Sequence, residues 1–454
     1  MKVIQVVPSI GAEASGPSYS VPGLCRGLQV NDVTTVLHFL DDVPNHLLNA
    51  SYQIENYPRQ DKFNLGWSSK MLQGLKEACQ SADIIHNNSL WMMPNVYPLW
   101  VCKGTKCKLV VAPRGTLADW SLKKGWLKKK IFGWLLQNAV LRHADMFHAT
   151  SEKEYEEIRA QGYKQPVAIV PIGMDMPVLG NKTTEDTENT EKELTTNCTN
   201  VQEFLKPQNT QKGSCGQDCQ EDGKPQKTEG YAPEHNVLGN TQKEDVGDLK
   251  LATGNWKQAT EHDRLRRIVF FGRVHKVKAV DHLVKAWGQL HANLPEWELV
   301  IAGPDCGAKG ELEAIIADEQ IPRVRFMGEI CGPAKYDFLT EADIYVLPSH
   351  TENFGVTVAE ALACGTPTIA SQGTPWKGLE TEKCGKWVPI GVEPLVYALR
   401  ELTRLTDDER ETMGQRGRAW IQRDFSWDGV GAKMKAAYVW LLGQGEKPNF
   451  VRMD

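Results

Sequence analysis

Two carboxylates lie eight positions apart in the segment SHTENFGVTVAEALACGTPTIAS, residues 349–371. Glu352 belongs to a polar turn, whereas Glu360 lies in a run of small apolar residues that we expect to be buried. A buried carboxylate is costly unless it has a partner. A core Lys or Arg would satisfy Glu360, and so would the vicinal hydroxyls of a sugar or ribose. The local sequence leaves both partners open.

The same segment predicts a helix over residues 355–363, which follows the ENFG turn and ends before Gly365 and Pro367. Amides at the start of a helix attract phosphate. Glu360 lies one turn inside this helix and Glu352 in the turn before it, so we expect both to line one cleft. The stretch thus suits a ligand with phosphate and hydroxyl groups.

A basic segment, GRVHKVK, places Arg273 and Lys278 on either side of the start of another predicted helix. The planar fork of Arg and the compact charge of Lys both suit a diphosphate. A solvated basic turn without a ligand is the alternative. The loop PSIGAEASGPSYSV, with Gly16, lacks the G-x-G-x-x-G spacing of a dinucleotide site, and a plain tight turn explains it equally well. Cations for a diphosphate and carboxylates for hydroxyls together describe a nucleotide-sugar site.

Short β-branched runs that alternate with helical patterns must position these residues. Buried strands are predicted at KVIQVVP, VTTVLHFL, ADIIHN, KLVVAP, DMFHATS and PVAIVPI, and again at RRIVFF, WELVIAGPD, RVRFMGEI, ADIYVLPS and TPTIAS. Strand and helix in alternation predict doubly wound α/β domains. Two Rossmann-like domains of this kind bind a ligand in a cleft at the carboxyl ends of their strands.

The chain is expected to divide into four segments. Residues 1–179 form an N-terminal, acceptor-side Rossmann-like domain, and residues 264–426 form a C-terminal domain that binds the nucleotide sugar. Residues 427–454 carry a helix, with Met434, Ala437, Tyr438 and Leu441 at helical spacing, that packs back on the first domain. Residues 180–263 are rich in Thr, Asn, Gln, Glu, Lys and Gly, so we expect a disordered insert at the interdomain linker.

Composition narrows the class of protein. The 454 residues are 41% hydrophobic and 24% charged with a net charge of −5, which is typical of a soluble globular protein and argues against a general nucleic-acid binder. No apolar run is long enough for a secretory signal or a membrane span, so we expect a cytoplasmic chain with reduced thiols. Cys215 with Cys219, and Cys102 with Cys107, lack a second ligand pair at zinc-site spacing, so no metal is expected.

These motifs resemble the retaining glycosyltransferases of family four, whose signature is E-x7-E and whose fold is GT-B: two Rossmann-like α/β domains that face a central cleft. The resemblance covers nearly all of the chain outside the insert and is closest to the branch that builds bacterial surface polysaccharides. Besides ENFG-x4-E, the motifs in family order are GPSYSV, HNNSLWMMPN, APRGTLADW, HATSEKEYEEIR, GRVHKVK, IAGPD, TPWKGLE and FSWD.

The resemblance implies roles for individual residues. Arg273 and Lys278 would hold the donor diphosphate, with Gly16 letting the first domain's loop approach, and Glu360 would bind the ribose hydroxyls. The donor sugar would be held by the turn that comprises Glu352, Asn353, Phe354 and Gly355, while amides from Gly355 to Thr357 meet the phosphate. His86 and Arg114, at the ends of first-domain strands, would face the donor sugar and the acceptor and complete the catalytic set with Glu352.

The implied activity is a retaining, metal-independent hexosyl transfer from a nucleoside-diphosphate sugar to a lipid-linked saccharide, without a cofactor, in surface polysaccharide biosynthesis. Three residues depart from the family pattern: Asn88 stands for a second His, Ile172 for an Asn and Ala279 for a Gly. Alternatives are a transferase with a small soluble acceptor, a catalytically silent binding or regulatory subunit with this fold, and a nucleotide-sugar epimerase.

A basic, aromatic segment at 120–137 has two interpretations. Leu127, Ile131, Trp134 and Leu135 fall on one helical stripe, and the lysines lie largely elsewhere. Such a helix can lie on an anionic membrane surface, which would make the cytoplasmic chain peripheral to the inner membrane face. An ordinary packed helix with a solvated lysine face is the alternative.

Overall fold

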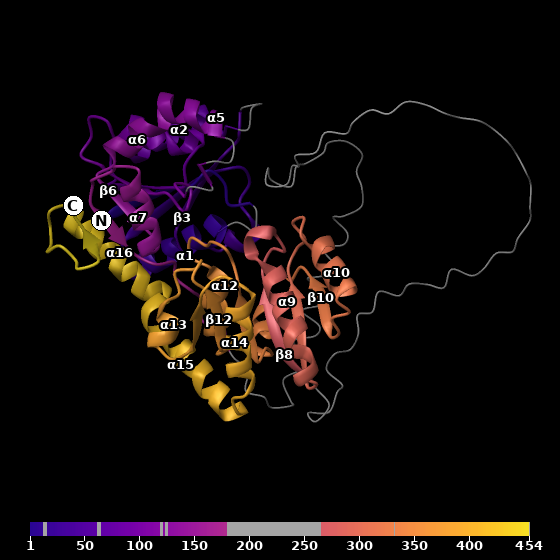
Figure 1. Ribbon diagram of the computed structural model, residues 1–454. Helices are drawn as coiled ribbons and strands as arrows, with labels where there is room; N and C mark the ends of the chain where they lie inside the picture. Colours follow the sequence, from indigo (N-terminus) through magenta and orange to yellow (C-terminus); the bar gives the residue numbers. More distant parts are fainter. Residues whose placement is uncertain are drawn as a thin grey trace, which may run out of the picture. The chain divides into compact units, whose positions relative to one another are not determined.

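The computed structural model describes residues 1–11, 16–60, 65–118, 121–122, 126–178, 265–330 and 332–453, without the side chains of 126–128. The predicted disordered insert, 180–263, lies outside the described residues. Two sheets organise the rest of the chain: the first is built from strands before this segment and one strand at the end of the chain, and the second from strands after the segment (Figure 1).

The first sheet has the strand order β14-β7-β6-β5-β4-β1-β2-β3. Its strands are β1 (Lys2–Val6), β2 (Thr34–Leu40), β3 (Gln53–Tyr57), β4 (Ile84–Asn88), β5 (Lys108–Ala112), β6 (Met146–Ala149), β7 (Val167–Ile169) and β14 (Val451–Arg452). All pairs are parallel except β14 with β7, in which Val451 lies opposite Ala168. The central strands are almost fully buried because both sheet faces are covered by helices.

The helices that follow these strands are α1 (Gly16–Val30), α2 (Ser69–Ala78), α3 (Tyr97–Cys102), α5 (Trp126–Phe132), α6 (Asn138–His143) and α7 (Glu152–Ala160), with short turns η1 (Asn45–Leu47) and η2 (Met93–Asn95). Between α5 and α6, residues Gly133–Gln137 (η3) form a π-helical turn. Gln137, at the end of this turn, is buried, and its Oε1 accepts a hydrogen bond of 3.0 Å from the Trp91 amide. Of the stripe expected at 120–137, Ile131, Trp134 and Leu135 are exposed.

The second sheet has the strand order β10-β9-β8-β11-β12-β13, and all its pairs are parallel. Its strands are β8 (Arg266–Phe271), β9 (Trp297–Ala302), β10 (Val324–Gly328), β11 (Ile344–Leu347), β12 (Thr368–Ser371) and β13 (Gly385–Val388). The helices are α9 (Val280–Leu290), α10 (Lys309–Asp318), α11 (Ala334–Thr340), α12 (Val356–Ala363), α13 (Gly378–Thr381), α14 (Val392–Thr403) and α15 (Asp407–Phe425), with short turns η4 (Lys276–Lys278) and η5 (His291–Asn293).

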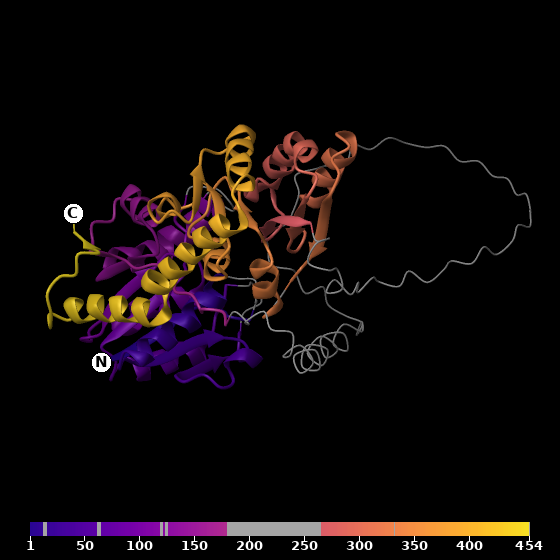
Figure 2. The same ribbon diagram turned by 90° about the horizontal axis from the view of Figure 1, so that it is seen from below.

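The last helix, α16 (Trp427–Leu441), packs along α1, and Figures 1 and 2 both show it beside elements of the first sheet. The two backbones approach closely because Gly27 and Gly431 face each other: a Cβ at Gly431 would lie 2.2 Å from the Gly27 carbonyl oxygen. Asn31 adds hydrogen bonds to the carbonyl oxygens of Gly27 and Asp428. Met434 and Tyr438 of α16 are fully buried.

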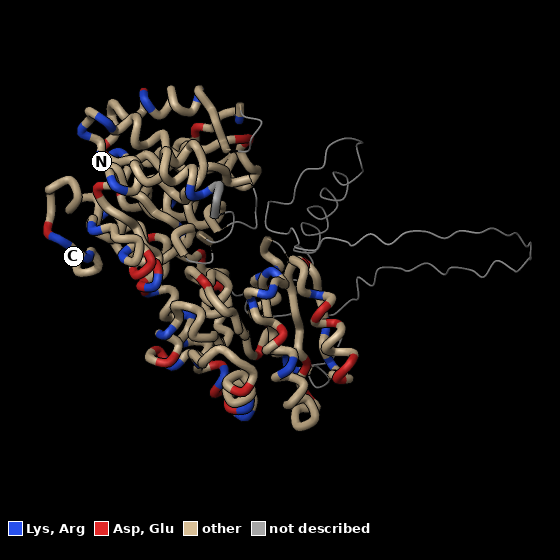
Figure 3. The backbone as a smooth tube through the Cα atoms, turned by 45° about the horizontal axis from the view of Figure 1, so that its top comes forward, with Lys and Arg blue, Asp and Glu red and all other residues tan. Residues whose placement is uncertain are grey.

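The parallel α/β class expected from the sequence is confirmed, and the predicted helix at 355–363 corresponds to α12. No helix in the described part of the chain is long and apolar enough to cross a bilayer. Acidic and basic residues are interspersed over the helices of the second sheet (Figure 3).

Candidate active site

The turn before α12 is fixed by a buried aromatic cluster. Gly355 adopts a left-handed conformation, with φ of 79°, and no side chain caps the helix there. Trp376 lies against this glycine and donates a hydrogen bond of 2.5 Å from Nε1 to the Phe354 carbonyl oxygen. The Phe354 ring is buried against Trp376 with a centroid distance of 5.2 Å. Phe354 therefore anchors the turn, and the uncapped helix start suits an anion.

Glu352, in this turn, is paired with a lysine from the basic segment. Its Oε1 lies 2.5 Å from Lys278 Nζ and accepts a second hydrogen bond of 2.7 Å from Ser349 Oγ. Both charged side chains keep only about 15% exposure, at 15% for Lys278 and 14% for Glu352. The fold thus brings together two residues that the sequence places 74 positions apart.

Glu360 is 5% exposed and has a lysine partner that the sequence did not reveal. Its Oε1 lies 2.6 Å from Nζ of Lys335, which extends from α11. Burial raises the pKa of Glu360, while the Lys335 charge opposes that rise. The Lys335 ammonium also lies over the rings of Tyr336 and Tyr19, at 4.8 and 5.6 Å. Of the two partners considered for Glu360, the core cation is present.

The buried phenol of Tyr345 contacts the start of α12. Its hydroxyl donates a hydrogen bond of 2.6 Å to Oγ1 of Thr357, in the first turn of α12. Burial raises the pKa of Tyr345 well above its usual value, and the negative charges of Glu352 and Glu360 add to this rise. Both carboxylates are therefore close enough to act on one phenol at the start of α12.

The loop between β8 and α9 carries the two predicted diphosphate ligands. Arg273 is exposed in this loop, while Lys278 ends η4. Ala279 follows with φ of 49°, a left-handed conformation that favours glycine. A glycine, which the resemblance implies for the family at this position, would adopt this conformation at less cost than Ala279.

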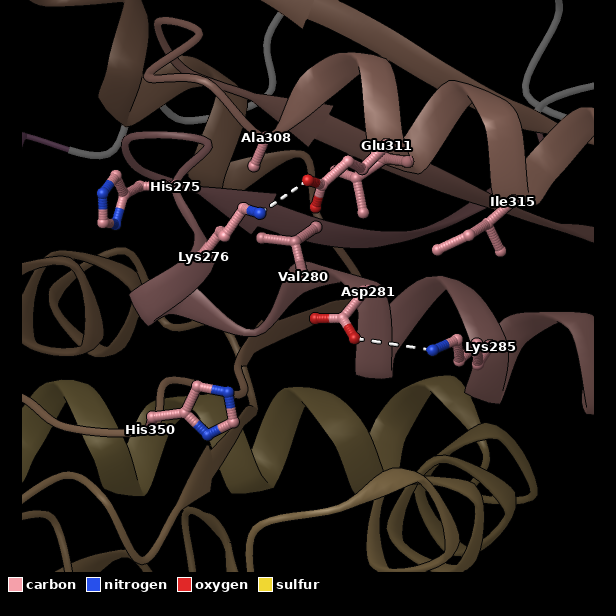
Figure 4. Close-up of a pocket in the computed structure, with 10 residues that line it drawn as sticks. His275, Lys276, Val280, Asp281, Lys285, Ala308, Glu311, Ile315 and His350 are labelled. Atoms are coloured by element: carbon pink, nitrogen blue, oxygen red, sulfur yellow. Dashed lines mark ion pairs between the residues drawn. The ribbon is translucent and has the colours of Figure 1, made fainter. Parts of the chain in front are cut away.

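A pocket of about 340 Å³, lined by both charged and apolar side chains, adjoins the same loop (Figure 4). It lies between the starts of α9 and α10, and His350 lines it from the loop after β11. Figure 4 shows Lys276 pointing toward Glu311, and their charged atoms are 2.6 Å apart. Lys276 is thus engaged with α10, whereas Lys278, two residues later, pairs with Glu352.

On the first sheet, His86 belongs to a buried hydrogen-bonded chain at β4. His148 Nε2 lies 2.8 Å from the Val170 carbonyl oxygen, so this nitrogen must donate, and His148 Nδ1 then accepts from His86 Nε2 at 3.3 Å. His86 Nδ1 accepts from the Tyr438 hydroxyl at 2.6 Å. Burial lowers the pKa of His148 to about 3 and that of His86 well below its usual value. Both rings are neutral.

This burial bears on the expected role of His86. The side chain has no exposed surface and both ring nitrogens are engaged, so it offers no group to a sugar in this conformation. The contact of His86 with the donor sugar stays a prediction. Its observed contacts make it a residue that joins β4 to α16 through Tyr438.

Arg114 is held at the carboxyl end of β5 by Asn88. Its Nη2 donates a hydrogen bond of 2.9 Å to Asn88 Oδ1, and Asn88 Nδ2 donates one of 2.9 Å to Gln5 Oε1. Arg114 itself has φ of 56°, a strained conformation for a residue with a side chain, and its Nε is buried without a partner. Asn88, a departure from the family pattern, therefore orients the predicted catalytic arginine.

The next residue, Gly115, is tied to α7 by a buried carboxylate. Glu154 has no exposed surface, and its Oε1 accepts a hydrogen bond of 2.7 Å from the Gly115 amide. Its Oε2 accepts from the amide and hydroxyl of Thr150, at 2.7 and 2.8 Å. These bonds fix the loop after β5.

Asn353 contacts elements of the first sheet. Its Nδ2 donates a hydrogen bond of 3.0 Å to Thr150 Oγ1, and its carbonyl oxygen accepts one of 3.1 Å from Ser151 Oγ. Lys153 donates to the Glu352 carbonyl oxygen at 3.2 Å and to the Thr351 hydroxyl. The turn with Glu352 and Asn353 is thus held by α7 as well as by Lys278.

The predicted site residues fall into two groups. One group surrounds the start of α12 and comprises Lys278, Glu352, Asn353, Phe354, Gly355, Thr357 and Glu360. The other group, His86 and Arg114, belongs to β4 and to the loop after β5. Gly16 is the first residue of α1. A Cβ at this position would meet no atom within 4 Å, so the space beside Gly16 is open. Lys335, Tyr345, Ser349 and Lys153 were not predicted as site residues from the sequence. Ser349 and Lys153 lie within the motifs named above, but their spacing did not indicate a role in the site.

Comparisons with known proteins agree with this arrangement. Residues 253–420 match the family of glycosyl transferases group 1, and residues 35–173 match the glycosyl transferase 4-like domain. The D-inositol 3-phosphate glycosyltransferase of Jonesia denitrificans is 34% identical over 180 residues, which are 38% of this chain and 42% of that protein.

A GDP-mannose-dependent monoacylated alpha-(1-6)-phosphatidylinositol monomannoside mannosyltransferase of Corynebacterium glutamicum is 30% identical over 207 residues, covering 42% of this chain and 52% of that protein. The chain thus spans about half the length of the curated relatives it matches.

Solved structures show the fold. HepE of Anabaena, in complex with UDP and glucose, superposes with a TM-score of 0.63 at 14% identity, covering 96% of this chain and 98% of that one. Sucrose-phosphate synthase of Thermosynechococcus elongatus gives 0.61 at 17% identity, with coverage of 98% and 100%. The GT-B fold expected from the sequence is confirmed.

Proposed function

We propose that this chain, which carries a glycosyl transferases group 1 domain and a glycosyl transferase 4-like domain on a GT-B fold, is a retaining, metal-independent glycosyltransferase. It moves a hexose-type sugar from a nucleoside-diphosphate sugar to a saccharide acceptor in surface polysaccharide biosynthesis. The first of the two relatives above is named for inositol 3-phosphate and the second for a phosphatidylinositol mannoside, which supports an acceptor of sugar or glycolipid type.

The pair between Lys278 and Glu352, beside the uncapped start of α12, carries the proposal. An ammonium and a helix start that point to one place can stabilise a diphosphate as it leaves. Arg273, in the same loop as Lys278, adds a second cation for this group. Glu352 holds Lys278 in position and offers its carboxylate to hydroxyls of the donor sugar.

Glu360 meets the ribose hydroxyls while Lys335 compensates its buried charge. In the transfer step, the bond from the anomeric carbon to the diphosphate oxygen breaks as the bond to the acceptor oxygen forms on the same face. The proton of the acceptor hydroxyl passes to the departing phosphate oxygen. Arg114, positioned by Asn88, stabilises negative charge at this centre.

The exposed apolar residues near α5 support a lipid-linked acceptor at the cytoplasmic face of a membrane. Ile131 is 53% exposed, Trp134 79% and Leu135 58%, and Lys130 beside them is also exposed. Aromatic and aliphatic side chains flanked by lysine favour an anionic lipid surface. The expected contact at 120–137 would bring the acceptor side of the cleft to the membrane.

A donor screen tests the function. Purified protein is incubated with a panel of uridine and guanosine diphosphate sugars, with and without membrane extract, and release of nucleoside diphosphate is followed. We expect release from one donor, enhanced by extract and lost in Lys278→Ala. Lys276→Ala is the matched control, because this neighbouring lysine pairs with Glu311 instead and should leave the rate unchanged.

The other outcomes separate the alternatives. Full activity on a small free sugar without extract would favour a soluble acceptor, and donor binding without turnover would favour a silent subunit. Proton NMR of the product reports its anomeric configuration. An anomeric configuration opposite to that of the donor would exclude a retaining mechanism. Flotation with anionic vesicles tests the membrane contact. Flotation that is lost in Trp134→Ala/Leu135→Ala and kept in the control Trp100→Ala, at another exposed tryptophan, would support it. No flotation of the wild type would count against it.

A further inference from the structure

Three cysteine thiols meet in the first domain, away from the residues of the proposed donor site. The Sγ atoms of Cys79, Cys102 and Cys107 all lie within 4.8 Å of one another. Cys79 follows α2, Cys102 ends α3, and Cys107 comes just before β5. Figure 1 labels α2, at whose end the first of them lies. Each of the other described cysteines lies outside any such group of three.

Hydrogen bonds from one threonine hold the loop that carries two of these thiols. Thr105 donates a hydrogen bond of 2.8 Å to the Cys102 carbonyl oxygen and accepts one of 3.2 Å from the Cys107 amide. Its Oγ1 also lies 3.7 Å from Cys79 Sγ. The loop therefore fixes Cys102 and Cys107 beside Cys79 and adds a hydroxyl oxygen at the edge of the cluster.

The cluster is shielded but reachable. Cys79 is 2% exposed and Cys107 6%, both within the apolar core of the domain, whereas Cys102 is half-buried. A shielded set of sulfur ligands with one partly open side suits a tightly held ion that enters from solvent.

We propose that Cys79, Cys102 and Cys107 bind one thiophilic d10 cation, Zn²⁺ or Cu⁺, as three thiolates. Metal–sulfur bonds of about 2.3 Å require sulfur atoms roughly 3.8–4.0 Å apart, so atoms within 4.8 Å need to move little. Thiolates select soft ions, and Cu⁺ accepts three ligands. Zn²⁺ takes a fourth ligand from water at the open side.

Binding converts up to three thiols into thiolates and releases their protons to solvent. The Cys79 thiol, which donates to the Val101 carbonyl oxygen at 3.4 Å, gives up this bond. Three thiolates leave the complex with a net charge of −1 with Zn²⁺ or −2 with Cu⁺. The exposed Lys103 and Lys106 in the Cys102–Cys107 loop offset this charge.

The test uses the full chain in a Cys215→Ser/Cys219→Ser background, because that C-x-x-x-C pair could bind metal independently. Reduced, metal-free protein is titrated with Zn²⁺ and, anaerobically, with Cu⁺, each against a chromophoric chelator. We expect one ion per chain. Co²⁺ substitution should give thiolate charge-transfer absorption, a readout independent of transferase activity.

Cys102→Ser should weaken binding by more than the roughly 10–100-fold that loss of an outer-shell partner costs. Cys306→Ser, also half-buried, is the matched control and should leave affinity unchanged. Cys79→Ala gives a second test, and circular dichroism of the metal-free variants verifies that each folds. Failure of both ions to bind the reduced chain, or equal affinity in Cys102→Ser, would overturn the proposal. A Cys102–Cys107 disulfide in the air-exposed chain, with no metal binding once that disulfide is reduced, would overturn it too.

Discussion

Replacing Lys335 with Met tests how Glu360 is stabilised. The substitution keeps the length and apolar stem of the side chain but removes the ammonium that lies 2.6 Å from Glu360. The carboxylate, 6% exposed as a side chain, would then have no compensating charge from α11. We therefore expect Lys335→Met to destabilise the second domain strongly at neutral and alkaline pH.

The magnitude follows from the burial of the pair. Removing one partner of a buried ion pair costs about 3–5 kcal/mol. Lys335 keeps 20% exposure, so water reaches the site and we expect the lower end, about 3 kcal/mol. For a domain of this size that corresponds to a fall in Tm of roughly 6–12 °C. Lys285→Met removes the exposed pair with Asp281 and, as the control, should cost no more than about 0.5 kcal/mol.

The pH dependence has a defined sign. Burial already raises the pKa of Glu360, and loss of Lys335 removes the charge that opposes the rise. A carboxyl group whose native pKa exceeds its unfolded value stabilises the fold when protonated, below the unfolded pKa, and loses this contribution as pH rises through the native pKa. The gap in Tm between wild type and Lys335→Met should therefore narrow as pH falls from 8 to 5.

Differential scanning calorimetry at several pH values provides the measurement. Lys335→Met/Glu360→Gln should recover most of the lost stability, because no charge remains buried. A Tm for Lys335→Met within 2 °C of wild type at pH 8, or a gap independent of pH, would refute the reasoning. The affinity of the double variant for the donor then distinguishes the two roles considered for Glu360. Weakened donor binding indicates that Glu360 contacts the ribose, and unchanged binding indicates that the carboxylate is only structural.

Two further predictions concern packing and acid sensitivity. Gly431→Ala should lower the free energy of unfolding in urea by about 1–3 kcal/mol, because its Cβ would lie 2.2 Å from the Gly27 carbonyl oxygen. In the control Gly310→Ala, in α10, the Cβ meets no atom within 4 Å, and the free energy of unfolding should rise by up to about 1 kcal/mol. Equal stabilities of the two variants would contradict the close helix contact. Burial lowers the pKa of His38 to about 4 and of His148 to about 3, so each contributes stability that is present above about pH 6.5 and is lost as pH falls, at up to about 1.4 kcal/mol per pH unit. His38→Gln should flatten the measured slope between pH 6.5 and 4, and an unchanged slope would contradict this.

Local signals predicted the buried elements well, although β10, predicted as a buried strand, lies at an edge of the second sheet and is not buried. The glycine and proline that follow α12 defined its end, and the apolar runs defined the central strands. β3, β13 and β14 were missed because they lie at sheet edges. β3 has the half-exposed sequence QIENY, β13 is largely half-buried, and β14 has only two residues, so none offers the continuous apolar run of a central strand.

Partners from distant elements could not be predicted. Lys335 meets Glu360, and Cys79 meets Cys102 and Cys107, only because separate helices pack together. His86 was expected at the end of a strand but lies in the middle of β4, and it is bonded to Tyr438, 352 positions later. Spacing along the chain contains no information on such contacts, since they depend on the order of strands in the sheet.

The late arrival of β14 and α16 affects how the protein is made. The second sheet is built from one continuous stretch, whereas the first sheet gains its edge strand β14 about 280 residues after β7 has left the ribosome. At roughly 5–20 residues per second, this delay lasts on the order of 15–55 s. During that time the edge of β7 and the glycine face of α1 stay uncovered. The domain synthesised first is thus the last to be completed, and its nascent form presents the surface that chaperones would need to protect.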